Sequence, residues 1–101
     1  MPYYLKYQLC TLYWRNKVDL TKIKSIIEDA IREQFPNAKI KVAQKYFYFE
    51  IAQKPTRGEL ISIGIYISQH SPLYQIVKEY ESKSGEHPPS RKLFECFEKN
   101  F

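Results

Sequence analysis

Residues 39–68 read KIKVAQKYFYFEIAQKPTRGELISIGIYIS, and most of this stretch follows a two-residue period. Phe47, Phe49 and Ile51 alternate with polar or tyrosine residues, and four isoleucines occupy every second position of 61–67. Alternating β-branched and aromatic residues are typical of strands with one buried face. The stretch therefore predicts a meander of strands at 39–43, 46–53 and 60–68.

The last of these strands has a helical alternative. Thr56 and Glu59 match the capping-box pattern that begins a helix. Four isoleucines at two-residue spacing would point to all sides of a helix, however, and Gly64 would weaken a helix by about 1 kcal/mol relative to alanine. We therefore predict a strand at 60–68, preceded by a turn at 55–58 that contains proline and glycine.

Two further elements are expected before this meander. Residues 3–14 alternate as a strand, with Lys6 on its more polar face. A first helix follows Asp19, whose carboxylate can cap the free amides of the first turn. Isoleucines at helical spacing give this helix a buried stripe. Pro36 ends the helix, because the residue before a proline avoids the helical region.

The last third of the chain predicts two helices. Ser71 and Pro72 mark the start of the first one, and Gly85 suits a left-handed cap at its end. Residues 86–89 then form a stiff linker with two prolines. A short C-terminal helix follows, and its apolar face contains Leu93, Phe94, Phe97 and Phe101.

These elements assign the fold class. The chain has 101 residues, which is enough for one domain and too few for two, so we expect a single domain over residues 1–101. The element order β-α-β-β-β-α-α predicts a two-layer α+β domain. In such a domain, helices cover one face of a mostly antiparallel sheet.

Composition limits the classes of partner and location. A net charge of +5 favours acidic partners such as nucleic acid. The sequence contains no apolar run of about 18 residues, so we expect no membrane span. Its first residues lack the pattern of a signal peptide, and we therefore expect a cytoplasmic protein.

The sequence indicates no catalytic residue, metal site or cofactor. Cys10 and Cys96 form no CxxC pair. They are expected to be reduced and mostly buried, with a disulfide between them as the alternative. His70 and His87 lack a partner at metal-ligand spacing. Glu50 and Glu59 flank the predicted turn at 55–58 and are interpreted as solvated.

A basic cluster surrounds the start of the first helix: Arg15, Lys17, Lys22 and Lys24. The helix dipole is already positive at this end, so helix stability alone would not favour cations there. One hypothesis is that these cations and the free amides hold an anion such as a phosphate. The alternative is a solvated surface without a ligand.

The outward face of the predicted sheet is a second candidate site. If Phe47 and Phe49 face the helices, the open side carries lysines and tyrosines, namely Lys39, Lys41, Tyr46, Tyr48 and Tyr66. Lysines interleaved with tyrosines suit a surface that contacts phosphates and stacks on bases. The same tyrosines could instead stabilise the sheet as cross-strand pairs or form a protein interface.

The sequence therefore predicts a small binding protein without catalytic activity. The favoured partner is nucleic acid, bound largely independently of its sequence through Arg15, Lys17, Lys22, Lys24, Lys39, Lys41, Tyr46 and Tyr48. The alternative is a protein-interaction or inhibitor module, either a homodimer or a domain that docks on a host factor. Such a module would use the tyrosine-rich face or an exposed strand edge.

Overall fold

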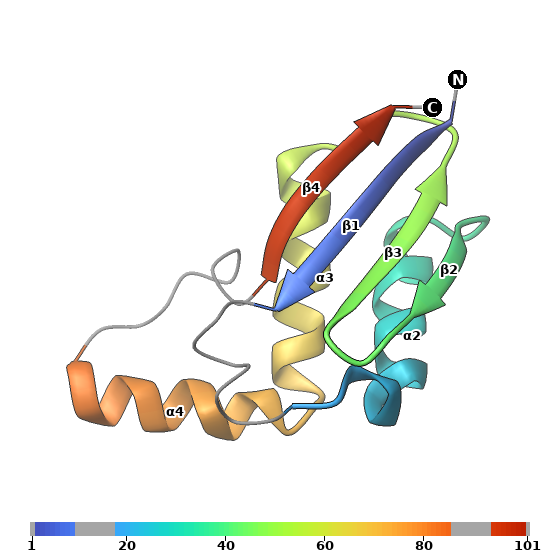
Figure 1. The fold of residues 1–101 in the computed structure, drawn as a ribbon. Helices are drawn as coiled ribbons and strands as arrows, with labels where there is room; N and C mark the ends of the chain where they lie inside the picture. Colours follow the sequence, from blue (N-terminus) through green and yellow to red (C-terminus); the bar gives the residue numbers. More distant parts are fainter. Residues whose placement is uncertain (1, 10–17, 86–93, 101) are drawn as a thin grey trace.

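Strand β1 (Tyr3–Leu9) lies inside a four-stranded antiparallel sheet in the computed structural model, which describes residues 2–9, 18–85 and 94–100 (Figure 1). The other strands are β2 (Lys39–Val42), β3 (Tyr46–Ile51) and β4 (Phe94–Asn100). Their order across the sheet is β2-β3-β1-β4, and every neighbouring pair is antiparallel.

The helical segments are η1 (Leu20–Ile23), α2 (Lys24–Gln34), α3 (Arg57–Gln69) and α4 (Leu73–Ser84). Figure 1 shows α2 and α3 behind the sheet, whereas α4 extends away from it. The predicted α+β class, with helices on one face of an antiparallel sheet, is confirmed.

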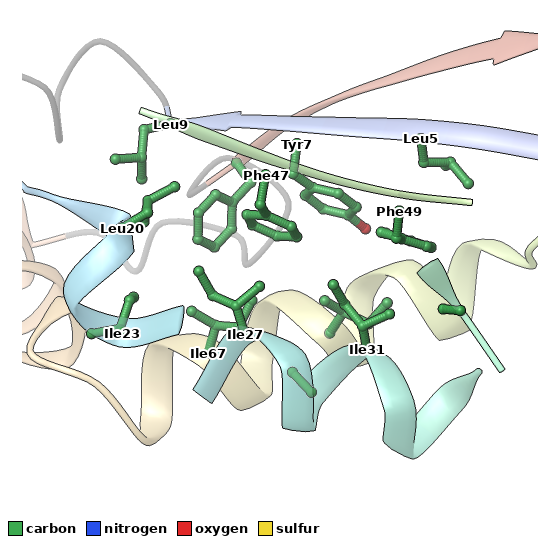
Figure 2. Close-up of a cluster of buried hydrophobic side chains, with 14 of the residues drawn as sticks. Leu5, Tyr7, Leu9, Leu20, Ile23, Ile27, Ile31, Phe47, Phe49 and Ile67 are labelled. Atoms are coloured by element: carbon green, nitrogen blue, oxygen red, sulfur yellow. The ribbon is translucent and has the colours of Figure 1, made fainter. Parts of the chain in front are cut away.

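The core fills the space between the sheet and the helices. Tyr7 stacks on Phe47 with ring centroids 5.0 Å apart, and Phe94 meets both rings edge-on. Isoleucines and leucines of η1, α2 and α3 close the other side of this cluster (Figure 2). The alternation that predicted an inward face for Phe47, Phe49 and Ile51 is confirmed, because all three are buried.

The prediction of a strand at 60–68 is wrong, because these residues belong to α3. Thr56 and Glu59 form a complete capping box, so Arg57 and Gly58 begin the helix instead of making a turn. The segment also contains a helical stripe that its two-residue period hides. Leu60, Ile63, Gly64 and Ile67 lie at helical spacing, and the last three are buried. Burial against the sheet and α2 outweighed the strand preference of isoleucine.

The predicted C-terminal helix is also wrong, because Phe94–Asn100 forms strand β4. An isolated helix of that length is marginal in water. Pairing with β1 instead satisfies the backbone groups of both strands, in a register that places Leu9 opposite Phe94 and Tyr3 opposite Asn100. Phe94 is buried beneath the sheet, as a core residue should be.

Other local predictions are confirmed. The Asp19 side chain accepts a hydrogen bond of 3.0 Å from the Thr21 amide, although the first turn is the 3-10 segment η1 and α2 begins only at Lys24. Gly85 has the left-handed conformation expected after α4, with φ of 73°. The predicted linker at 86–89 and the predicted strand residues at 10–14 lie outside the described residues.

Candidate nucleic-acid interface

The sheet has a second face, which points away from α2 and α3 (Figure 1). We call it the outer face. It carries the side chains that alternate with the core residues of three strands: Tyr4, Lys6, Gln8, Lys39, Lys41, Tyr46, Tyr48 and Glu50. Both β2 lysines are exposed and the other six residues are half-buried. The outer face therefore combines aromatic rings with cations at the surface.

Three tyrosines of the outer face form a continuous aromatic row. The ring centroids of Tyr4 and Tyr48 are 4.8 Å apart with the rings tilted by 44°. Those of Tyr48 and Tyr46 are 6.1 Å apart, and these rings are nearly parallel. The row arises because Tyr46 and Tyr48 alternate along β3, while Tyr4 on β1 is a diagonal neighbour of Tyr48 in the antiparallel register.

Lysines from the two neighbouring strands lie on this tyrosine row. The Lys6 ammonium on β1 is 4.4 Å from the centroid of the Tyr46 ring. The Lys41 ammonium on β2 is 5.8 Å from the centroid of the Tyr48 ring. Both distances are within the range of cation–π attraction, which is worth about 0.5–1 kcal/mol at exposed sites. The pairing concentrates positive charge directly beside the rings.

The electrostatics of the row keep its groups in the states that suit an anionic partner. Burial, reinforced by the neighbouring Tyr48, raises the pKa of the Tyr4 phenol above its ordinary value. A hydrogen bond with Tyr48 and the attraction of that phenol raise the pKa of the Lys41 ammonium. An ordinary tyrosine is already neutral and an ordinary lysine already charged at neutral pH, so both shifts reinforce these states without changing them.

A cavity of about 270 Å³ opens beside the row between β1, β2 and β3. Its lining residues are Tyr4, Lys39, Ile40, Lys41, Tyr48 and Glu50. Lys39 and Glu50 are directly opposite in the β2–β3 register, and their charged atoms are 3.7 Å apart. This separation permits an ion pair but exceeds an ordinary hydrogen bond. The cavity therefore offers an aromatic wall, an acceptor and a donor.

A second hollow, of about 620 Å³, lies at the other end of the row. Lys6, Lys45 and Tyr46 line it together with Thr21 of η1. The Leu20 amide of η1 donates a hydrogen bond of 2.9 Å to the Gln44 carbonyl, which holds η1 next to the connection between β2 and β3. The hollow therefore reaches from the outer face to η1. Cations thus flank the tyrosine row at both ends.

The structure brings four of the predicted site residues together. Lys39, Lys41, Tyr46 and Tyr48 share the outer face, as the alternation predicted. The prediction that Tyr66 joins them is wrong, because it assumed a strand at 60–68. Tyr66 lies on α3, where it packs against the core and stacks on His70 with ring centroids 4.1 Å apart.

The predicted basic cluster at the helix start is only partly described. Lys22 and Lys24 are exposed on η1 and α2, in the layer behind the sheet. Hydrogen bonds from Thr21, with a smaller contribution from the Lys22 charge, lower the pKa of the Asp19 carboxyl. Lys22 therefore has an acidic neighbour of its own. Arg15 and Lys17 lie outside the described residues.

Tyr4 and Lys6 are two further parts of the site that the sequence pattern did not indicate. Both lie on the polar side of β1, and the two-residue period that placed Lys6 opposite the core face also applies to Tyr4. The period within β1 does not predict that β1 pairs with β3, and this pairing brings Tyr4 and Lys6 next to Tyr46 and Tyr48.

His70, Glu59 and Glu50 each make a contact within the fold. His70 Nδ1 is 2.9 Å from the Tyr66 carbonyl oxygen at the end of α3. Glu59 belongs to the capping box, and Glu50 pairs with Lys39. Within residues 2–9, 18–85 and 94–100, no three metal-binding side chains gather into a group. Cys10 and His87 lie outside the described residues.

No family model, curated protein or solved structure matches the chain. Of the described helices, none combines the length and the hydropathy that crossing a membrane requires.

Proposed function

We propose that the outer face binds single-stranded nucleic acid. The observation that supports this proposal is the tyrosine row of Tyr4, Tyr48 and Tyr46, which has lysine ammonium groups 4.4 and 5.8 Å from two of its rings. Aromatic rings on an open sheet provide stacking surfaces for bases, and the cations beside them attract phosphates.

The arrangement favours single strands over duplexes. Bases can stack on protein rings only when they are not already paired and stacked in a double helix. Each base stacked on an aromatic side chain contributes about 1–3 kcal/mol, whichever base it is. Binding is therefore largely independent of sequence, apart from the local chemistry of the cavity beside Tyr48.

Phosphate contacts come from the lysines around the row. Lys6 and Lys41 lie against its rings, and Lys45 lines the hollow beside Tyr46. Three phosphate contacts with a single strand give a log–log salt slope of about −2. Affinity should then fall roughly twentyfold between about 50 and 200 mM salt.

Fluorescence anisotropy with labelled single-stranded and double-stranded oligonucleotides at these two salt concentrations tests the proposal. We expect tighter binding of the single strand, with the salt dependence given above. Equal affinity for the duplex would contradict the stacking of unpaired bases on the tyrosine rings. Absence of binding at both salt concentrations would overturn the proposal.

A protein partner is the second candidate, and the position of β4 favours it. This strand ends the sheet order, so in the described part of the chain one of its edges faces no other strand. Such an edge can pair with a strand of another chain. The opposite edge is less suited, because β2 has only four residues, two of them exposed lysines. A dimer in light scattering at micromolar concentration would support this candidate.

A further inference from the structure

We infer that the cavity beside the tyrosine row, lined by Tyr4, Lys39, Ile40, Lys41, Tyr48 and Glu50, receives one unpaired guanine base. This inference rests on the proposed function, because the base would belong to the strand bound across the outer face. It adds one selective position to binding that is otherwise independent of sequence.

The walls of the cavity suit a flat aromatic ligand. The Tyr4 and Tyr48 rings line it from β1 and β3. Ile40 of β2 also borders the cavity, while its side chain packs against the core on the other face of the sheet. The two tyrosine rings are tilted by 44° and do not stack face to face. A base that stacks on Tyr48 would have its edge near the Glu50 and Lys39 side chains, which line the same cavity.

The polar groups of the cavity match the Watson–Crick edge of guanine. An ionised carboxylate only accepts hydrogen bonds, and an ammonium only donates them. Guanine presents two adjacent donors, N1–H and the N2 amino group, followed by the acceptor O6. Glu50 can accept from both donors while Lys39 donates to O6, since their charged atoms are only 3.7 Å apart.

The existing Lys39–Glu50 pair would not prevent this binding. The Lys39 side chain is 86% exposed and that of Glu50 is 33% exposed. An exposed pair of this kind is worth little on its own, so its partners can reorient toward a ligand. Both groups come from directly opposite positions on paired strands, which fixes their spacing.

The other bases fit less well. Thymine and uracil present a single N3–H between two carbonyl groups, so at least one carbonyl would approach the Glu50 carboxylate. Adenine and cytosine each present an amino group beside a bare ring nitrogen, which is an acceptor and would also face that carboxylate. Two acceptors placed together without a proton lose a hydrogen bond and repel one another.

The test compares oligothymidylate of about ten nucleotides with the same strand carrying one central guanine, and with one carrying inosine, which lacks the N2 amino group. A bidentate contact should make the guanine strand bind at least about fivefold tighter than oligothymidylate. The inosine strand should fall between them, because it keeps only one of the two donors. Fluorescence anisotropy at constant salt gives all three affinities.

Glu50→Gln should bind the guanine strand and oligothymidylate with equal affinity, because the glutamine amide replaces one acceptor by a donor. The control Glu33→Gln removes an exposed carboxylate from α2 and should retain the preference. Equal affinity of the wild-type protein for all three strands overturns the guanine site and leaves the proposed function standing. Failure of the wild-type protein to bind any strand overturns both. An undiminished guanine preference in Glu50→Gln also overturns the site.

Discussion

Lys6 on β1 and Tyr46 on β3 form a cross-strand pair in which the ammonium lies 4.4 Å from the ring centroid. The two residues are not directly opposite, since Lys6 faces Tyr48 and Gln8 faces Tyr46 in the register. The long lysine side chain therefore reaches diagonally across the sheet. This pair joins the cationic and aromatic parts of the outer face at one point.

Lys6→Gln should reduce the salt dependence of oligonucleotide binding. Losing one phosphate contact lowers the log–log slope by about 0.7 for a single strand. Loss of the cation–π contact should cost about 0.5–1 kcal/mol of stability at most. The matched control is Lys83→Gln, which removes the same charge from the exposed side of α4. Equal slopes in the two variants would contradict a phosphate contact at Lys6.

Tyr48→Val should weaken binding of a single strand by roughly 5- to 150-fold, which corresponds to the loss of one base stack. Valine retains a strong preference for strands, so β3 should remain intact. Tyr74→Ala serves as the control because Tyr74 is 45% exposed on α4, outside the outer face. Titration by anisotropy measures both variants, and a loss no greater than that of the control would contradict stacking.

Tyr7→Phe tests the connection between the sheet and α3. The Tyr7 hydroxyl donates a hydrogen bond of 3.0 Å to the Leu60 carbonyl, 53 residues away. Phenylalanine keeps the ring stacked on Phe47 but removes this bond, so the free energy of unfolding should fall by about 0.5–1.5 kcal/mol. Thermal denaturation should show a melting temperature lower by several degrees. Tyr74→Phe, at an exposed position, should melt like the wild type.

Thr56→Ala tests the capping box that begins α3. The Thr56 hydroxyl accepts a bond of 3.2 Å from the Glu59 amide, and the Glu59 carboxylate accepts one of 2.9 Å from the Thr56 amide. Alanine should cost about 0.5–2 kcal/mol in chemical denaturation. Thr56→Ser restores the acceptor and should recover most of that stability. Equal losses in both variants would show that the hydroxyl does not cap the helix.

Asp19→Asn should remove one source of acid sensitivity. Hydrogen bonds from Thr21 hold the folded-state pKa of Asp19 below its ordinary value of 3.8. The stabilisation from the charged carboxylate is therefore fully present above pH 3.8 and is lost as pH falls through the lower folded-state pKa. Asparagine still caps the turn without titrating. Denaturation at several pH values should show wild type more stable at neutral pH, with the difference disappearing in acid.

Part of the candidate site, like part of the fold, follows from local sequence patterns, and the rest depends on which strands pair. The two-residue period predicted that Lys39, Lys41, Tyr46 and Tyr48 share one face, and they do. That face acquires its cation–π pair with Tyr46 only through Lys6 of β1. No local pattern states which strands will be neighbours, and residues of β1 and β3 are about forty positions apart in the sequence.

The sequence by itself determined what depends on neighbouring residues: the alternation of β1 and β3, the Asp19 cap, the stripe of α2 and the left-handed Gly85. Tertiary structure decided between local alternatives of similar free energy. Residues 60–68 contain both a two-residue and a helical pattern, and burial of Ile63 and Ile67 selected the helix. Residues 94–100 became a strand because β1 had backbone groups to pair. Long-range burial and hydrogen bonding outweigh local preferences of about 1 kcal/mol, and they alone bring β1, β2 and β3 together into the outer face.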